Sequence, residues 1–367
     1  MGILMEKYKF GKEEDVTCRS LKADELTCPT KETTLPLVIE STNNCSFDFL
    51  YDFAIRNKVI LRQLLAEHGG ILFRGFDIKK PDQFKAVMST FTTDLAEDYK
   101  GIAPRKHVTD HVFTTTEVTD YAIILPHSEM AYSYQRPGII GFCCQVAPSI
   151  YGETSLFNCG SVYNSLSQEC IDLLEKGIQY VRCHPHHWEK HLFKTGSTWP
   201  ESFSTEDKKE VEKSLKEAGF DYEWDEKNQL KITTSLPVFI THPLTKQKYV
   251  NILFSHSINE FKTLNLFKQR YSILLRYIVK IVAAFAMLKG KGVGLTKIYD
   301  HNGSPLPRHI IKELHKAFWD HSVLFAWRKN DVLVLDNITT AHGRMNVIGS
   351  RKILACLGEP YFMEKKI

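Results

Sequence analysis

Short apolar segments bounded by turn-forming residues occur in two blocks that lie far apart in the chain. The first block covers residues 121–157, and the second covers residues 325–357. Segments of about four to eight apolar residues between proline- or glycine-containing turns are typical of strands. Several such strands favour a β-sandwich or a β-barrel. The sequence therefore predicts a mainly β core to which both halves of the chain contribute.

Apolar residues also recur at helical spacing outside these blocks. The expected helices cover residues 52–68, 161–178, 205–218, 267–288 and 307–319. Gly69 and Gly70 end the first of them. A buried strand over residues 71–76 follows, and Pro81 then opens another helix. The expected fold class is mainly β with flanking helices.

Length alone does not decide between one large domain and two, because 367 residues fit either arrangement. The chain contains no internal repeat and no low-complexity stretch. Residues from about 180 to 225 are unusually rich in His, Trp, Lys and Glu. We expect a single domain over residues 1–367, with insertions between core strands at approximately residues 180–225 and 260–320.

Charge and cysteine content indicate a compartment and disfavour some partners. With 25% charged residues and a formal net charge of +4, neither nucleic acid nor a membrane surface is indicated as a partner. The most apolar run, residues 277–288, is too short for a membrane span. Nine cysteines without regular spacing fit a reducing cytoplasm, and Cys143 and Cys144 lie in an apolar run that favours core packing over redox chemistry. We expect a cytoplasmic protein, and its oligomeric state stays open.

A candidate metal-binding motif lies at the end of the strand pattern around residue 125. His127 and Glu129 are two positions apart, so on a strand their side chains would point to the same face. His342, which follows the apolar segment of residues 331–336, is the best candidate for a third ligand. Two histidines and one carboxylate leave other metal positions open, as in non-haem Fe(II) oxygenases. A His-x-Glu pair alone is weak evidence, so the surrounding sequence has to decide.

The surrounding sequence resembles the clavaminate synthase-like branch of the TauD/TfdA family, Fe(II)- and 2-oxoglutarate-dependent oxygenases built on a double-stranded β-helix. Matching segments run in order from about residue 71 to residue 357. They are Ile-Leu-Phe-Arg-Gly-Phe at 71–76, Leu-Pro-His-Ser-Glu at 125–129, Tyr-Gly-Glu-Thr at 151–154, His-Pro-Leu-Thr at 242–245, Asp-Asn at 336–337 and His-Gly-Arg at 342–344. The resemblance implies a jelly-roll core with helical insertions, and iron bound by His127, Glu129 and His342.

The resemblance also implies a site for the co-substrate 2-oxoglutarate, which reacts together with O₂. The distal carboxylate of 2-oxoglutarate needs a buried cation, and an arginine side chain can hold it in a bidentate manner. Arg351, where the last strand begins, is preferred, with Thr154 as its hydroxyl partner. Arg344 is the competing candidate, and its other interpretation is a structural salt bridge. Some relatives place a second arginine four positions after the first, but this chain has Ala355 there, which argues against an anionic head group at that position.

Glu129 itself restricts the chemistry, because halogenating relatives replace the carboxylate with a small residue. The resemblance implies hydroxylation, desaturation or another oxidation of an amino-acid-like substrate, either free or attached to a carrier protein. Arg105 and Tyr132 flank the metal motif and are candidates for substrate contact. The position that is oxidised stays open.

Three other hypotheses remain at this point. The chain could be a catalytically silent protein that binds metal or a partner on the same fold, or a structural cupin-like module, which would not need Arg351 or Thr154. The histidine-rich segment 183–191 could bind zinc, since histidines four apart on a helix can share a metal ion. Pro185 breaks that helix, however, so a surface segment over the active site is preferred, with Trp188 in packing or substrate contact.

Overall fold

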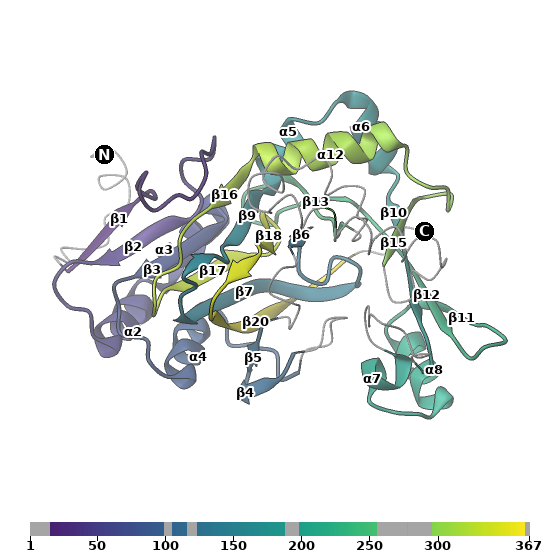
Figure 1. The fold of residues 1–367 in the computed structure, drawn as a ribbon, viewed down its shortest axis with the longest axis horizontal. Coiled ribbons are helices and arrows are strands. Elements are labelled where there is room, and N and C mark those ends of the chain that lie inside the picture. Colours follow the sequence, from purple (N-terminus) through teal and green to yellow (C-terminus); the bar gives the residue numbers. More distant parts are fainter. Residues whose placement is uncertain are drawn as a thin grey trace.

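The protein is described by a computed structural model, which places residues 15–98, 105–115, 123–187, 198–254, 277 and 296–363. Figure 1 shows a large sheet in the left half of the molecule, a bundle of short elements above it, and a smaller sheet at the right. The expected helix over residues 267–288 lies outside the described residues, and so do parts of both expected insertions.

The large sheet has eight strands in the order β1-β2-β3-β17-β7-β20-β5-β4. All neighbours are antiparallel except β2 and β3. The strands are β1 (Val16–Arg19), β2 (Leu37–Ser41), β3 (Gly70–Arg74), β4 (His107–Thr109), β5 (Val112–Thr114), β7 (Gln135–Val146), β17 (Val332–Asp336) and β20 (Lys352–Phe362). Both predicted strand blocks enter this sheet, because β7 from the first block lies between β17 and β20 from the second.

A second sheet, in the order β16-β9-β18-β6, faces the first. Its strands are β6 (Ile124–His127), β9 (Thr154–Asn158), β16 (Ser322–Leu324) and β18 (Thr340–Arg344). Leu333 and Leu335 of β17 pack toward Leu156 of β9 in the core between the two sheets. Val332 and Val334, the alternating residues of β17, pack on the opposite face against helices. Both faces of β17 are therefore covered, which explains its uninterrupted apolar sequence.

The outer face of the large sheet is covered by α2 (Phe47–Arg56), α3 (Lys58–His68) and α4 (Pro81–Ser89). The prediction of one helix over residues 52–68 was wrong, because the helical conformation is interrupted at Asn57, between α2 and α3. Asn57 has φ of −106° and ψ of 14°, and its side-chain amide donates to the Phe53 carbonyl as α2 ends. Gly69 ends α3 in the left-handed conformation, as expected.

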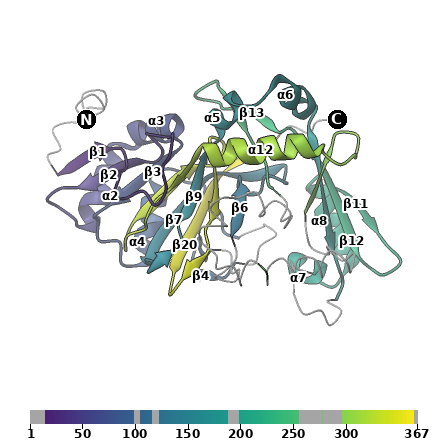
Figure 2. The same ribbon diagram turned by 45° about the horizontal axis from the view of Figure 1, so that its top comes forward.

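The upper part of the molecule consists of short helices packed over the second sheet. The segment 161–178, predicted as one helix, forms α5 (Cys159–Asn164) and α6 (Gln168–Glu175), because Ser167 accepts a hydrogen bond from the Cys170 amide and starts a new helix. Helix α12 (Arg308–Asp320), predicted over residues 307–319, runs horizontally through the upper half of Figure 2, below α5 and α6. A two-stranded ribbon of β13 (Phe239–Thr241) and β14 (Lys248–Val250) packs into the same apolar cluster.

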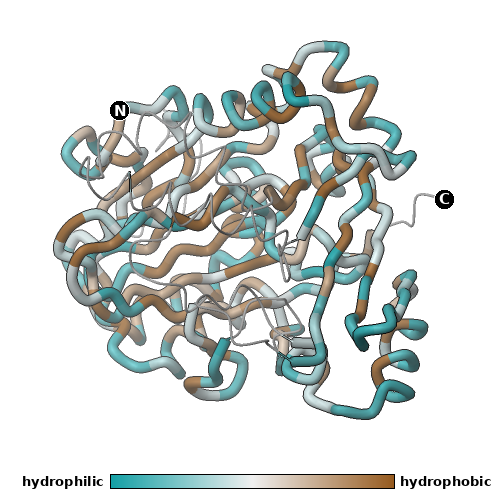
Figure 3. Tube along the Cα trace, turned by 45° about the vertical axis from the view of Figure 1, so that its right-hand side comes forward, coloured by the Kyte–Doolittle hydropathy of each residue, from teal (hydrophilic) through white to brown (hydrophobic). Residues whose placement is uncertain are grey.

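The smaller sheet has the order β11-β12-β10-β15. It consists of β10 (Ile178–His184), β11 (Asp221–Trp224), β12 (Leu230–Leu236) and β15 (Lys297–Asp300), with the short helices α7 (Trp199–Phe203) and α8 (Lys208–Glu217) packed nearby. Residues on β10 alternate between buried and half-buried positions, so one face of this strand points toward the interior. In Figure 3, hydrophobic stretches run along the central strands, whereas the peripheral helices alternate between hydrophobic and hydrophilic residues.

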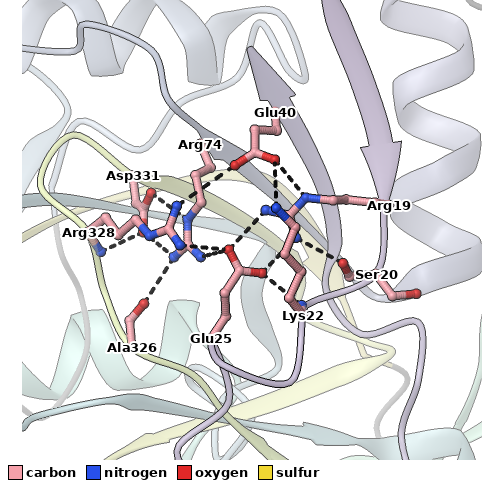
Figure 4. A network of polar contacts seen from close by, with 9 residues as sticks. All are labelled: Arg19, Ser20, Lys22, Glu25, Glu40, Arg74, Ala326, Arg328 and Asp331. Carbon is pink, nitrogen blue, oxygen red and sulfur yellow. Dashed lines mark hydrogen bonds and ion pairs between the residues drawn. The ribbon is translucent and has the colours of Figure 1, made fainter. Parts of the chain in front are cut away.

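A buried network of charged residues joins β1, β2 and β3 of the large sheet to the segment before β17 (Figure 4). Glu25, with its side chain 1% exposed, receives hydrogen bonds from Arg19 and Arg74. Arg74 in turn binds Asp331 through Nε and Nη2, at 3.1 and 2.6 Å. Each buried charge has a partner of opposite sign, and the pairs link the N-terminal residue Glu25 to Asp331 near the other end of the chain. The resemblance segment 71–76 therefore contributes a structural arginine.

Two further findings bear on the composition arguments. All nine cysteines are free, and burial raises the pKa of Cys143 and Cys144 to about 12, as expected for thiols in a core. Among the residues that the structure places, no helix is both long and apolar enough to cross a membrane.

Candidate metal centre

Two histidines from neighbouring strands face each other in the second sheet. His127 ends β6, and His342 lies at the middle of β18, directly opposite His127 in the antiparallel register. Side chains of directly opposed residues project from the same face of a sheet, and the centroids of the two imidazole rings lie 4.4 Å apart. Strand pairing therefore brings together two residues that are far apart in the chain.

Glu129 lies in a turn beyond the end of β6 rather than on the strand. The expectation that strand alternation places it beside the first histidine was wrong in this respect. The strand stops because the Ser128 amide donates to the Ile252 carbonyl, and Met130 adopts a φ of 54° in the turn. The carboxylate nevertheless reaches the site, since its Oε2 lies 3.7 Å from Nε2 of His342.

The donor atoms of His127, Glu129 and His342 all lie within 4.8 Å of one another. Nδ1 of His127 is 2.9 Å from the Leu125 carbonyl oxygen, so Nδ1 carries the proton and Nε2 keeps its lone pair for a ligand. Burial lowers the pKa of His127, and burial together with the neighbouring His127 lowers the pKa of His342 well below its usual range. Both imidazoles are therefore neutral near pH 7, which is the form that binds a metal ion. This set of donors fits Fe(II).

Gly343 allows β18 to lie close to β6 at the site. A Cβ atom at this position would lie 2.5 Å from the carbonyl oxygen of Ile124 and 2.8 Å from the hydroxyl oxygen of Ser155. Real Cβ atoms do not approach backbone oxygens so closely, so any side chain here would push the strands apart. The glycine between the second histidine and Arg344 therefore keeps the two histidines together.

Asn337 holds the loop that carries Glu129. It is fully buried, its Oδ1 accepts from the Glu129 amide at 2.7 Å, and its Nδ2 donates to the carbonyl oxygens of Glu129 and Pro137. Arg136 supports this arrangement by donating to the carbonyl oxygen of Asn337 at 2.8 Å. Sequence reasoning quoted Asn337 as part of a motif but gave it no role. Its position directly after the acidic end of β17 was the available signal.

His242 fixes the neighbouring turn. Nδ1 of His242 accepts from the amides of Leu244 and Thr245, so Nε2 is the protonated nitrogen and donates to Asp336 at 3.1 Å. The other oxygen of Asp336 accepts from the amides of Ile338 and Thr339, and the turn leads directly into β18. The His-Pro-Leu-Thr segment of the sequence resemblance therefore orients the chain between Asn337 and the second histidine.

Arg105 balances the charge of the buried carboxylate. Its Nη2 lies 2.7 Å from Oε2 of Glu129, and the two side chains are 3% and 4% exposed. The sequence proposed Arg105 for substrate contact, whereas in the structure its partner is a candidate metal ligand. The guanidinium compensates the negative charge that burial would otherwise penalise.

Arg351 and Thr154 contact each other beside the histidines. Arg351 donates through Nε to the Gly152 carbonyl at 2.8 Å and through Nη2 to the Thr154 hydroxyl at 3.2 Å. The Trp327 indole also donates to this hydroxyl, at 3.3 Å. The Arg351 guanidinium and the Trp327 indole both donate to the hydroxyl oxygen of Thr154. The hydroxyl hydrogen of Thr154 is therefore still available to donate to a ligand. A carboxylate held by Arg351 would be such an acceptor.

One pocket contains both groups of residues. It is lined by Arg105, Thr115, Ile124, His127, Phe142, Thr154, His342, Gly343, Arg344 and Arg351. Arg344 lies opposite Thr154 in the register between β18 and β9, so it faces the same pocket as its competitor Arg351. The structure thus brings the six sequence-derived site residues close together, with Arg105 beside them, and it adds Trp327 and Asn337.

The histidine-rich segment is only partly described. His184 is a buried residue at the end of β10, with Nδ1 3.3 Å from the Ser202 hydroxyl. His186 stacks on Trp199, with ring centroids 4.9 Å apart. Trp188 and His191 lie outside the described residues. Within the described part of the chain, the group at His127 is the single cluster with metal-binding geometry.

Comparison with known proteins agrees with this geometry. Residues 41–357 match the family model described as taurine catabolism dioxygenase TauD, TfdA family. The chain is 26% identical to the dapdiamide synthesis protein DdaC of Enterobacter agglomerans over 330 residues, covering 89% of this chain and 91% of that protein. It is also 28% identical to a clavaminate synthase-like protein of Arabidopsis thaliana over 305 residues, covering 82% and 84% respectively.

Solved structures share the fold. PvcB of Pseudomonas aeruginosa, described as an Fe, alpha-ketoglutarate dependent oxygenase from an isonitrile synthetic pathway, superposes with a TM-score of 0.53 at 11% identity, over 95% of this chain and 93% of PvcB. AAD-2, solved with Mn(II) and N-oxalylglycine, gives a TM-score of 0.50 at 12% identity, over 96% of this chain and 99% of AAD-2. These similarities, together with the two facing sheets, confirm the predicted jelly-roll core with helices.

Because the family model matches most of its length, the chain belongs to the TauD/TfdA family of Fe(II)- and 2-oxoglutarate-dependent dioxygenases.

Proposed function

We propose that this protein oxidises a small amino-acid-like substrate with O₂ and 2-oxoglutarate, and that His127, Glu129 and His342 bind the iron. The observation that carries the proposal is that these three donors lie within 4.8 Å of one another, and that both histidines line the same pocket as Arg351 and Thr154. Iron bound there supplies the oxygen-activating chemistry of the family, in which 2-oxoglutarate becomes succinate.

Other residues of this chain would bind the co-substrate and position the metal ligands. Arg351 and Thr154 would hold the distal carboxylate of 2-oxoglutarate through a guanidinium and a hydroxyl donor, and Arg344 would line the other side of the same pocket. Phe142 packs against His342, with ring centroids 5.2 Å apart, and keeps water from that side of the imidazole. Asn337 and His242 would fix the loops that carry the ligands.

The nature of the substrate rests on the relatives. DdaC takes part in dapdiamide synthesis, and PvcB belongs to an isonitrile synthetic pathway. These roles support a small-molecule substrate, and relatives in the clavaminate synthase-like branch support an amino-acid-like one. We propose hydroxylation or desaturation, since Glu129 keeps the carboxylate that halogenating relatives lack. A substrate that is either free or attached to a carrier protein belongs to the same proposal, and so does a cytoplasmic location, which fits nine free cysteines. So does the organisation as one domain over residues 1–367.

The direct test is conversion of 2-oxoglutarate to succinate by the full chain with Fe(II) and O₂, in the presence of free and carrier-bound amino acids. We expect iron-dependent succinate formation that the Glu129→Ala variant loses, while an Arg62→Gln variant, altered in a surface ion pair with Glu359, retains it. Mass spectrometry of the acceptor should show a gain of one oxygen or a loss of two hydrogens. Succinate formation that is equal in the Glu129→Ala variant would contradict the proposal, and its complete absence in the unaltered chain would favour a catalytically silent protein.

A further inference from the structure

Arg182 is a buried arginine without a carboxylate partner. It lies on the interior-facing side of β10, its exposed fraction is 8%, and no ion pair joins it to a carboxylate of the described residues. Among the other buried arginines, Arg19, Arg74 and Arg105 each face a carboxylate, whereas Arg136 donates to the carbonyl oxygen of Asn337. An isolated charge in a protein interior costs several kcal/mol unless something compensates it. The site of Arg182 therefore needs a negative group that the described residues do not supply.

Aromatic rings cover the two faces of this guanidinium. Its Cζ lies 4.7 Å from the ring centroid of Tyr132 and 5.1 Å from that of Phe220. Such contacts stabilise a cation through its faces and leave the N–H groups at its edge directed elsewhere. Nε and Nη2 are both buried and have no hydrogen-bond partner among the described residues. This edge of the guanidinium therefore presents two neighbouring N–H donors that no described residue uses.

The same edge of another arginine shows which ligand it fits. Arg74 uses Nε and Nη2 to hold the two carboxylate oxygens of Asp331, at 3.1 and 2.6 Å. A planar fork of this kind matches a carboxylate in a bidentate manner. Arg182 presents an equivalent fork, already desolvated and held between rings, so a carboxylate would find two preoriented donors.

Two series of contacts connect Arg182 with the candidate metal centre through intermediate residues. Tyr132, which covers one face, belongs to the turn that begins with Glu129. Tyr180, two residues before Arg182 on the same face of β10, accepts from the Leu253 amide at 3.0 Å, and Leu253 forms a β-bridge with His127.

We propose that Arg182 binds a free carboxylate of the substrate, through Nε and Nη2, while the carbon to be oxidised lies at the metal. This inference deepens the proposed function and rests on it, because it makes the substrate a free acid rather than one whose only carboxyl group is consumed in a thioester to a carrier protein. It also assigns the missing anion site, since Ala355 stands where some relatives have a second arginine.

The test uses acetate as the simplest carboxylate and the full chain loaded with Mn(II) and N-oxalylglycine, so that the metal and co-substrate positions are filled. We expect acetate to raise the Tm in a saturable way, by on the order of 2 °C at ten times its Kd, relative to chloride at equal ionic strength and to acetamide. The Arg182→Met variant should lose this rise and Arg182→Lys should keep part of it. The surface variant Arg62→Met should keep all of it.

A second measurement separates a ligand site from a structural role. Without acetate, Arg182→Met should have a Tm equal to or above that of the unaltered chain, because it removes an uncompensated buried charge. A lower Tm for that variant, or an acetate effect that survives in it, or no advantage of acetate over chloride in the unaltered chain, would overturn the proposal. Failure of Mn(II) or N-oxalylglycine to bind would instead count against the proposed function, and the acetate titration is then read on the unloaded chain.

Discussion

One buried amide, Asn337, fixes the position of Glu129. Its side chain satisfies the backbone N–H and C=O of Glu129 and also the carbonyl of Pro137. Because Glu129 lies in a turn and not on a strand, no sheet ladder holds it in place. The amide therefore replaces the support that β6 and β18 give to the two histidines.

Replacing Asn337 by Ala should lower the affinity for Mn(II) or Fe(II) by about 10- to 100-fold, as is usual when a group that orients a metal ligand is lost. Isothermal titration with Mn(II) measures this. Asn158→Ala is the matched control, since Asn158 caps α5 and its loss should cost about 1 kcal/mol of stability without changing metal affinity. Equal Mn(II) affinity in both variants would remove the positioning role of Asn337.

Arg351 and Arg344 face the same pocket, and substitution separates their roles. Arg351→Ala should weaken N-oxalylglycine binding by about 10- to 100-fold, because a charged hydrogen bond is worth about 1.5–3 kcal/mol, while Mn(II) affinity stays the same. Arg344→Ala should have the smaller effect on N-oxalylglycine. Fluorescence or calorimetric titration distinguishes the two, and the reverse order would assign the co-substrate to Arg344.

The pairing of β6 with β18 creates the candidate metal centre, and it depends on the close approach at Gly343. The register places His342 opposite His127, and it shifts between His342 and Arg344, next to this glycine. The strand pattern around residue 125 predicted β6, whereas no separate strand was predicted over residues 340–344, where β18 lies. The sequence patterns did not identify the register, because pairing is set by contacts between segments far apart in the chain.

Gly343→Ala should separate the two strands and so reduce metal affinity, in addition to destabilising the protein by about 1–3 kcal/mol through overpacking. Leu50→Ala is the control, because this buried residue of α2 packs on the outer face of the large sheet and its truncation should cost about 2–5 kcal/mol. Mn(II) titration well below the Tm of both variants should show a loss only for Gly343→Ala. A matching loss in both would mean that general destabilisation explains the effect.

Across the molecule, the sheets join segments from the whole described chain. The charge network in Figure 4 joins residues 19–40 to Arg74 and Asp331. Apolar segments in the sequence predicted the β core, and short motifs predicted the three metal-ligand candidates. The Arg351–Thr154 pair came from the resemblance to a known family. Sequence reasoning missed Asn337, Trp327 and the lone Arg182. Their importance depends on which distant residues surround them, and a single sequence does not contain that information.

Glu25 gives the fold a dependence on pH. Burial alone would raise the pKa of the Glu25 carboxyl, but hydrogen bonds from Arg19, Lys22 and Arg74 outweigh it and lower the pKa to about 2. A carboxyl with a depressed pKa in the folded state stabilises the fold above the unfolded pKa, near 4.5, and loses this contribution as the pH falls toward 2. Glu25→Gln should therefore lower stability at pH 7 by about 3 kcal/mol or more, because it leaves buried arginines without their partner.

Urea denaturation at pH 7 and at pH 3 measures this. The difference between the variant and the unaltered chain should shrink at the lower pH. Asp77→Asn, which breaks an exposed ion pair with Lys79, should change stability little at either pH. A Glu25→Gln deficit that is independent of pH would contradict the depressed pKa.

The measurement that tests the metal centre most directly is a crystal structure with Mn(II) and N-oxalylglycine, using the anomalous signal of manganese. The account predicts one peak bound by His127, Glu129 and His342, with the distal carboxylate of N-oxalylglycine on Arg351 and Thr154. A peak bound by other residues, or an inhibitor carboxylate held away from Arg351, would contradict it.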